Sequence, residues 1–244
     1  MIYPLLWLVA SSFKSNDTMF KNTYSLFAST AGYSFGHFFM NSAIVTVIGV
    51  VCTIFFSLLA TYAVSRVKFF GANFWFGCII MTMMIPAQVM VVPQYIILKK
   101  LHLNDTLLAM ILPWAFGGAF FVFLIVQYMR GLPYEIIEAA RIDGAGPFRI
   151  FWTIVLPLIR PILTTVIVFQ TMGTWNDFMT PSVYISSTNK QTIVLQVFNA
   201  ISPFTTNWPL FMTVTTIALI PVFVFFIFCQ RWIVAGLVAG SVKG

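Results

Sequence analysis

Apolar runs of about 20 residues recur along the chain, and their length limits the possible folds more than any other feature. A helix needs roughly 20 residues to cross a hydrocarbon core of about 30 Å. The ten-residue alternating segments that are typical of outer-membrane barrels do not occur. The sequence therefore predicts an all-α integral membrane protein. The complete runs cover about residues 39–64, 74–98, 107–129, 156–175 and 210–229.

The chain opens on a further apolar run, MIYPLLWLVASSF, which is short for a membrane span. We interpret it as the outer half of a longer helix, which gives six transmembrane helices with an incomplete first one. A signal peptide is the alternative, but no basic segment precedes the run and no convincing A-x-A cleavage site follows it.

The composition supports a membrane protein, since 60% of the residues are hydrophobic and only 8% are charged. The mean hydropathy is +0.95, which a soluble domain of this size could not shield from water. Cys52, Cys78 and Cys229 each lie singly within an apolar run, so they are expected to be small buried hydrophobes. Neither a metal site nor a disulfide is predicted.

The basic residues predict the orientation of the chain. With six spans both termini lie on one side of the membrane, and all six arginines fall on that side. Positive residues collect on the cytoplasmic side, so both termini are predicted to be cytoplasmic. This distribution accounts for the formal charge of +7 without a nucleic-acid partner.

No soluble domain or repeat is visible, so a single membrane domain is predicted over residues 1–244. An external loop is expected at about 176–208 and a cytoplasmic tail at about 230–244. Pro86, Pro93, Pro113, Gly117 and Gly118 interrupt the spans. Such interruptions are tolerated where neighbouring helices or water satisfy the freed backbone groups.

The interiors of the spans contain no ionisable groups of the kind that carry ions or protons, but they contain neutral hydrogen-bonding side chains. These groups have two interpretations. They could bond between helices, which contributes about 0.6 kcal/mol each, or they could line a path for a neutral, hydroxyl-rich solute. The candidate path residues are Asn41, Gln88, Gln94 and Gln170, with Trp175 and Asn176 at the outer end of the fifth span.

The sequence also excludes several kinds of chemistry. No G-x-x-x-x-G-K-[ST] loop occurs, so no ATP-binding site is expected in this chain. No His, Cys, Asp or Glu cluster has the spacing of a metal or catalytic site. An enzyme is therefore not predicted, and any energy source must lie in another subunit.

Residues 135–146, EIIEAARIDGAG, hold three of the six acidic residues of the chain. Pro133 is favoured at a first helical position, an acid at Glu135 suits the helix dipole, and Gly144 favours a left-handed stop. A short helix is therefore predicted over residues 134–143. A second start at Gly146 and Pro147 leads into the fifth span.

The short helix is predicted to be amphipathic and to lie outside the bilayer. Its predicted apolar face carries Ile136, Ala139 and Ala140 with Ile137 at the margin, and its polar face carries Glu135, Glu138 and Arg141. A helix resting on lipid headgroups would carry mainly basic residues. Because acids outnumber the base here, a protein partner with cationic groups is favoured. The two alanines would let that partner approach closely.

The spacing of this region resembles a known family signature. It reads Glu138-Ala139-Ala140, three residues, Gly144, nine residues, Ile154, one residue, Leu156-Pro157. This is similar to the EAA motif of binding-protein-dependent ABC importer permeases. Two further stretches resemble the shorter membrane subunit of maltose-type importers, namely WNDF at 175–178 and the tail QRWIVAGLVAGSVKG from Gln230. MIPAQVMVVPQYIIL at 84–98 is similar to the family's third span, so the likeness covers about residues 38–244.

The resemblance implies a multi-pass permease of the bacterial cytoplasmic membrane that imports a sugar, such as an oligosaccharide or a related glycoside or polyol. Its partners would be a homologous second permease, two cytoplasmic ATPase subunits that bind ATP and Mg, and an extracytoplasmic solute-binding protein. A coupling helix at about 134–147, between spans four and five, would dock on an ATPase. The residues implied in coupling are Glu138, Ala139, Ala140, Arg141, Asp143 and Gly144.

The external loop at 176–208 would face the solute-binding protein, with Asp177 and Trp208 as contacts. The tail at 230–244 would touch the ATPases or be a frayed end. Two alternatives remain at this point, namely an ATP-independent channel or facilitator for small neutral solutes and a structural scaffold. The sequence does not name the sugar.

Overall fold

The computed structural model describes residues 8–9, 12, 35–67, 69–200 and 208–241. The short first run at 1–13 lies largely outside these residues, as do residues 201–207 of the expected external loop and 242–244 of the tail. Over the described residues all regular structure is helical, which confirms the predicted all-α class.

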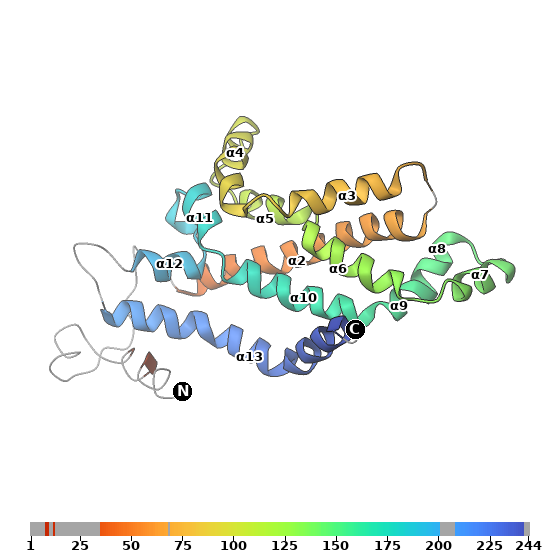
Figure 1. The fold of residues 1–244 in the computed structure, drawn as a ribbon. Coiled ribbons are helices and arrows are strands. Elements are labelled where there is room, and N and C mark those ends of the chain that lie inside the picture. The colour runs from red at the N-terminus through yellow and green to blue at the C-terminus, as the bar shows by residue number, and fades with distance from the viewer. Residues whose placement is uncertain (1–7, 10–11, 13–34, 68, 201–207, 242–244) are drawn as a thin grey trace. The chain divides into compact units, whose positions relative to one another are not determined.

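Figure 1 shows the order of the helices along the chain. Between α8 and α9 one turn is a π-helix, η1, over Phe151–Val155, and a 3₁₀ turn, η2, covers Thr188–Lys190. The α-helices are α2 Phe35–Arg66, α3 Ala72–Thr82, α4 Ala87–Lys100, α5 Leu107–Ala115, α6 Ala119–Arg130, α7 Glu135–Ile142, α8 Pro147–Ile150, α9 Leu156–Leu158, α10 Arg160–Trp175, α11 Met179–Tyr184, α12 Ile193–Asn199 and α13 Trp208–Ser241.

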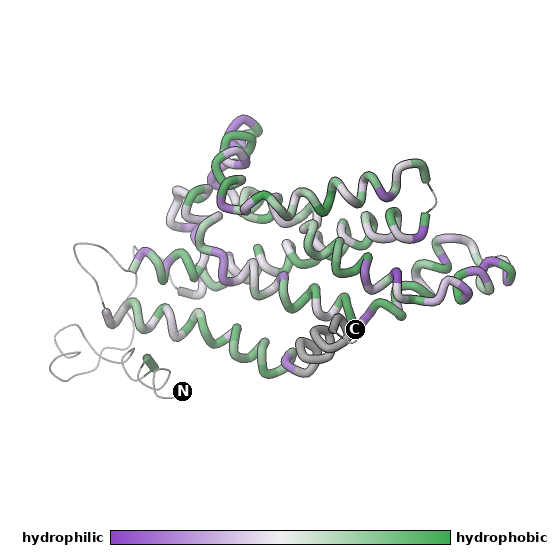
Figure 2. Tube along the Cα trace, in the orientation of Figure 1, coloured by the Kyte–Doolittle hydropathy of each residue, from purple (hydrophilic) through white to green (hydrophobic). Residues whose placement is uncertain are grey.

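Three stretches of the described chain are long and apolar enough to cross a membrane, Gly36–Arg66, Leu107–Arg130 and Phe211–Gln230. Two further helix pairs raise the number to as many as five if each bent pair is one span: α3 with α4, and Pro147–Leu158 with α10. Figure 2 shows that hydrophobic residues predominate along the coloured part of α13. Three of the complete predicted runs thus coincide with apolar candidate spans, and each of the other two coincides with a bent helix pair. The number of six stays a prediction.

The break in the Leu107–Arg130 span shows how an interrupted span keeps its backbone satisfied. Thr53 on α2 donates a hydrogen bond from Oγ1 to the carbonyl oxygen of Trp114 at 2.7 Å. Gly117 has φ +82°, and a Cβ at this position would lie 2.8 Å from the Ser57 Oγ. A glycine is therefore required by both conformation and space. The predicted compensation by a neighbouring helix is confirmed at this break.

The chain divides into two compact units, each made of several segments. Unit 1 comprises residues 1–48, 91–113 and 172–228, and unit 2 comprises residues 49–90, 114–171 and 229–244. Several helices pass from one unit into the other along their length. The prediction of a single permease domain stays a prediction.

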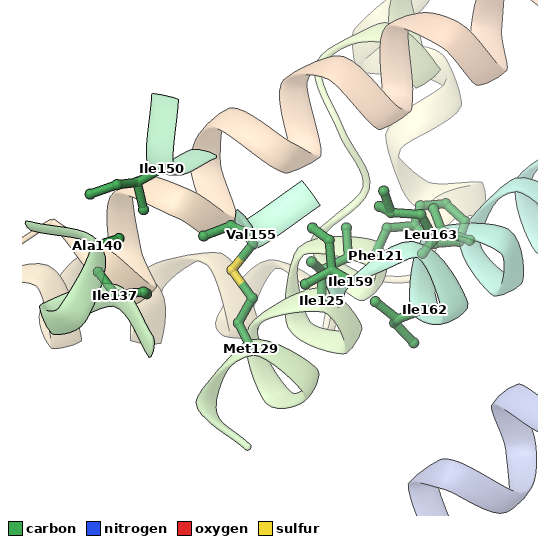
Figure 3. Packing of buried hydrophobic residues seen from close by; sticks show 11 residues of the cluster. Phe121, Ile125, Met129, Ile137, Ala140, Ile150, Val155, Ile159, Ile162 and Leu163 are labelled. Atoms are coloured by element: carbon green, nitrogen blue, oxygen red, sulfur yellow. The ribbon is translucent and has the colours of Figure 1, made fainter. Parts of the chain in front are cut away.

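The core of unit 2 joins α6 to the chain around α9 and α10, and it extends to α7 and α8 (Figure 3). Met129 near the end of α6 is fully buried, as are Val155 and Ile159. Ile137 and Ala140 of α7 and Ile150 of α8 belong to the same buried cluster. The short helices outside the predicted spans are thus fixed to the spans by apolar packing.

Unit 1 has two smaller buried clusters. In one, Phe38 near the start of α2 packs with Trp175, Ile193, Val214 and Ala218. Trp175 also donates a hydrogen bond from Nε1 to the carbonyl oxygen of Ala218 at 3.2 Å. In the other, Val91, Leu98 and Ala109 pack around Tyr184. These clusters position the polar segment between α11 and α12.

Candidate functional site

The helix α7 forms where the sequence predicts it. The carbonyl oxygen of Tyr134 accepts from the backbone N–H groups of Ile137 and Glu138 at 3.0 and 3.1 Å. At the other end Gly144 has φ +77°. The Gly144 N–H donates to the Arg141 carbonyl at 3.0 Å, and the Ala145 N–H donates to the Ala140 carbonyl at 2.9 Å. This Schellman arrangement confirms the predicted left-handed stop.

The buried face of α7 differs from the predicted one. Ile137 and Ala140 are only 6% and 7% exposed, because they pack into the unit 2 core beside Ile150 (Figure 3). Ile136 and Ala139 are exposed. The prediction that Ile136, Ala139 and Ala140 form one face with Ile137 at its margin is therefore wrong. Ala140 lets α7 sit closely on its own core, and Ala139 alone of the two alanines points outward.

The outward side of α7 is charged, as predicted, and its charged side chains are Glu135, Glu138, Arg141 and Asp143. Large apolar side chains near it are also exposed, which the sequence interpretation missed. Ile142 is 86% exposed and Phe148 is 76% exposed, and Trp152 is also exposed, with its ring centroid 6.2 Å from that of Phe148. Exposed apolar groups next to charged ones are typical of a protein-docking surface. We refer to residues 135–152 as the α7–α8 region.

Arg66, the last residue of α2, connects that helix to the start of the α7–α8 region. Its guanidinium is largely buried and donates to the carbonyl oxygens of Met129 and, at 3.4 Å, Leu132. It also lies 5.8 Å from the ring centroid of Tyr134. The last carbonyls of a helix carry partial negative charge, so a cation is favoured here.

A second contact from α2 reaches the other side of the α7–α8 region. The Tyr62 hydroxyl donates to the carbonyl oxygen of Pro147 at 3.5 Å. The Tyr62 ring also packs edge-on against Phe151, with the centroids 5.1 Å apart. Tyr62 and Arg66 lie one helical turn apart on α2, so one face of that helix holds both ends of the region.

The chain bends sharply after the α7–α8 region. The segment Pro147–Leu158 and α10 meet at an angle of 72°. The bend follows the π-helical turn Phe151–Val155 and the motif positions Leu156 and Pro157. A proline lacks the N–H that would continue the helix ladder, and π-helical turns often mark functional positions.

Most of the predicted path residues bond to the protein itself. Asn41 donates from Nδ2 to the carbonyl oxygens of Asn189 and Gln191 at 2.9 and 3.0 Å. Gln94 accepts a hydrogen bond from the Tyr184 hydroxyl at 2.9 Å. For these two amides, and for Trp175, bonds between segments distant in sequence are confirmed.

The remaining predicted residues differ in burial and in partners. Gln88 is exposed on α4 and Gln170 is fully buried on α10, and both belong to unit 2. Asn176 donates to the Met172 carbonyl of its own helix at 2.9 Å. Asp177 accepts from the Thr180 N–H at 3.1 Å, and Trp208 is exposed at the start of α13.

The structure contains a polar cluster in unit 1 that sequence reasoning missed, which we call the Asp105 latch. It comprises Asp105, which lies between α4 and α5, and Ser186, Ser187 and Lys190, which follow α11. Asp105 Oδ1 accepts from the N–H groups of Ser186 and Ser187 at 3.0 and 2.9 Å. Asp105 Oδ2 accepts from the Ser187 hydroxyl and lies 3.5 Å from the Lys190 Nζ.

The electrostatics of the latch keep its carboxylate charged. Partial burial by itself would raise the pKa of Asp105, but the hydrogen bonds from Ser187 and Ser186 and the charge of Lys190 outweigh this effect. The pKa of Asp105 is lowered to about 2. The sequence signal for this cluster is limited to an Asp in a polar turn. Asp is one of the residues that tolerate a left-handed φ, and Asp105 has a φ of 56°.

No group of three or more His, Cys, Asp or Glu side chains within the described residues is placed to hold a metal ion. Cys229 is buried, as expected, whereas Cys52 and Cys78 are half-buried.

Comparison with known proteins gives a consistent result. The family described as binding-protein-dependent transport system inner membrane component matches residues 53–238. The arabinooligosaccharides transport system permease protein AraQ of Halalkalibacterium halodurans is 32% identical, over 100% of this chain and 91% of its own length. The probable starch degradation products transport system permease protein AmyC of Thermoanaerobacterium thermosulfurigenes is 33% identical, over 99% of this chain and 92% of its own.

Solved structures agree on the fold. A chain in the crystal structure of a bacterial ABC transporter involved in the import of the acidic polysaccharide alginate superposes with a TM-score of 0.77. The two chains are 23% identical, and the match covers 94% of this chain and 90% of the other.

Proposed function

The chain belongs to the family of binding-protein-dependent transport system inner membrane components, and from that premise we propose that it is a permease subunit of an ATP-driven sugar importer. The sugar is an oligosaccharide or a related glycoside or polyol. The membrane is the bacterial cytoplasmic membrane, and both termini of the chain lie on its cytoplasmic side.

The printed functions of the relatives support this substrate class. AraQ belongs to a transport system for arabinooligosaccharides and AmyC to one for starch degradation products. A further relative, UgpE of Yersinia pestis, belongs to a system for sn-glycerol-3-phosphate. These substrates are sugars or polyol derivatives. The comparisons thus support the importer and not an ATP-independent channel or facilitator.

The observation that carries the mechanism is the construction of the α7–α8 region. Its inner side is packed into the unit 2 core through Ile137 and Ala140, and its outer side combines charges with the exposed Ile142 and Phe148. A region fixed this firmly to the spans moves with them. Force applied by a soluble partner on the outer side is therefore transmitted to the transmembrane helices.

We assign the partner in this contact as a cytoplasmic ATPase subunit, of which the importer holds two, each binding ATP and Mg. Glu138, Ala139, Arg141 and Asp143 face it, and Gly144 makes the turn that ends the docking helix. Ala140 packs into the unit 2 core and so holds the helix against the spans. A homologous second permease and an extracytoplasmic solute-binding protein complete the importer.

The sugar path is proposed to use polar groups that are not held between distant segments. Gln88 is exposed, and Asn176 bonds only within its own helix turn. Gln170 is proposed for its amide alone, since its buried side chain has interactions of its own. Asn41, Gln94 and Trp175 have structural partners, which supports a role in fixing the walls of the path rather than in contacting the sugar.

Reconstitution tests the function directly. The chain is purified from its native membrane, and copurification of an ATP-binding polypeptide is expected. Proteoliposomes with ATP inside and the solute-binding protein outside should accumulate a labelled oligosaccharide. A chain that purifies alone, or that passes solute without ATP, would contradict the proposal. A glycoside that shares no sugar with the oligosaccharide serves as the negative substrate.

A further inference from the structure

The segment between α11 and α12, residues 185–192, is polar and lies outside the predicted spans, yet other parts of unit 1 hold it from two sides. We propose that Asp105 is a positioning residue that holds residues 186–190 as a rigid docking platform for the solute-binding protein. The inference rests on the proposed function, which supplies that partner.

The Asp105 side of the platform consists of backbone and side-chain bonds together. The Asp105 N–H donates to the Tyr184 carbonyl at 2.9 Å, and the Lys190 Nζ donates to the Asp105 carbonyl at 2.6 Å. The carboxylate accepts from the consecutive N–H groups of Ser186 and Ser187. A single residue therefore satisfies backbone groups at the start of the platform and binds the side chain at its end.

The start of α2 holds the other side of the platform. Asn41 donates to the carbonyl oxygens of Asn189 and Gln191, and the His37 Nε2 lies 2.6 Å from the Asn189 carbonyl oxygen. The Ser42 Oγ accepts from the Ile193 N–H at 2.9 Å, which secures the first turn of α12. The platform is thus fixed to α2 as well as to the turn between α4 and α5.

The exposed groups of the platform suit a soluble protein rather than lipid. Ser186 and Asn189 are exposed and Thr188 is half-buried, and all three carry hydrogen-bonding side chains. Lys190 is paired with Asp105, so it does not act as an isolated cation. Fixing such a surface before contact lowers the entropic cost of docking.

The conformation of Asp105 also points to a selected role. Its φ of 56° is left-handed, which is uncommon for a residue other than glycine. A conformation of this kind persists only where surrounding contacts hold it. The hydrogen bonds to residues 184–190 supply those contacts.

The test uses the assembled importer in lipid nanodiscs and measures ATP hydrolysis as a function of solute-binding protein concentration. Asp105→Gly accepts the left-handed φ but removes the carboxylate. It is expected to raise the binding-protein concentration for half-maximal stimulation about tenfold or more, since several charge-assisted hydrogen bonds are lost. Basal hydrolysis without binding protein is expected to stay unchanged.

Two milder variants separate positioning from general damage to the fold. Asp105→Asn keeps an acceptor and tolerates the left-handed φ, so a shift of about threefold is expected. Lys190→Met removes the ion pair and the hydrogen bond from Lys190 Nζ to the Asp105 carbonyl, and it should also give about threefold. Ser182→Ala is the matched control, because the Ser182 hydroxyl bonds only to the Met179 carbonyl of its own helix in the described structure.

The outcomes distinguish the latch from the function on which it rests. A wild-type importer that binding protein does not stimulate would overturn both proposals. Normal stimulation of the wild type, with unshifted half-maximal concentrations in Asp105→Gly, Asp105→Asn and Lys190→Met, overturns the latch alone. If Asp105→Gly does not assemble, an unshifted Lys190→Met and Asp105→Asn still refute the proposal.

Discussion

Arg66 at the end of α2 donates a hydrogen bond to the carbonyl oxygen of Met129, one residue before the end of α6. In the sequence, α2 and α6 are separated by α3, α4 and α5. This bond nevertheless joins the ends of α2 and α6 beside Tyr134, where α7 starts. The α7–α8 region is consequently attached to two of the long apolar helices rather than to one.

Replacing Arg66 by Gln tests this attachment. The variant loses charge-assisted bonds to the carbonyls of Met129 and Leu132, so the importer should lose about 2 kcal/mol of stability. Thermal denaturation of the purified complex measures the loss. Arg149→Gln is the control, because Arg149 is exposed. The hydrogen bond from the Thr153 hydroxyl goes to the backbone carbonyl of Arg149, which the substitution keeps. Equal melting temperatures for both variants would refute the role of Arg66.

The adjacent alanines of α7 form a matched pair. Ala140→Leu overfills the unit 2 core and should cost about 1–3 kcal/mol in stability. Ala139→Leu adds bulk on the exposed side, so it should leave stability within about 0.5 kcal/mol of the wild type and weaken ATPase attachment. Melting temperature and copurified ATPase give the two readouts. Equal losses of stability in the two variants would indicate that both alanines lie on one packed face, as the sequence predicted.

Substitutions of Gly144 test whether the left-handed turn after α7 is required for function. A Cβ at this position meets nothing within 4 Å, so a substitution is opposed only by the φ of +77°. Gly144→Ala should destabilise the turn by about 1 kcal/mol, whereas Gly144→Asn, which tolerates this φ, should be milder. Gly144→Asp adds a negative charge beside Asp143 and is expected to uncouple ATP hydrolysis from uptake. Parallel assays of uptake and hydrolysis decide, and unaltered coupling in Gly144→Asp would contradict the docking role.

Glu138→Ala removes the proposed charged contact while leaving the buried face of α7 intact. Uptake per ATP hydrolysed, or ATPase attachment, should fall about threefold to tenfold, with no loss of permease stability, since Glu138 is exposed. Glu135→Ala, also exposed and in the same helical turn, serves as the comparison. A similar effect in both variants would indicate general electrostatic attraction instead of a specific pair.

The Asp105 latch has a defined pH dependence. The folded pKa of Asp105 lies near 2, below its usual value of 3.8, so its contribution is fully present above about pH 4 and is lost as the pH falls toward 2. Hydrogen-exchange protection factors for the Ser186 and Ser187 amides should decline over that window. In Asp105→Asn they should not change with pH. A decline beginning near pH 6 would point to another group.

Much of the fold could be predicted from the sequence because the responsible interactions are local. The length of each apolar run places α2 and α13, and the acids and Gly144 place both ends of α7. The motif positions from Glu138 to Pro157 likewise lie within one short stretch at fixed spacings, which is why they could be recognised. Such features depend on backbone geometry and on transfer from water to lipid, and both act on short segments.

Other features were decided by tertiary structure alone. Which side of α7 is buried depends on Ile150 and the end of α6, so the predicted face was wrong by about one residue position. Asn41 and Asp105 find their partners 148 and 82 residues away, at Asn189 and Ser187. Periodicity identifies a polar side chain within a span but not its partner, because hydrogen bonding depends on three-dimensional proximity. The sequence therefore determined the helices and the motif at α7, and the packing of the chain decided which of their side chains face inward.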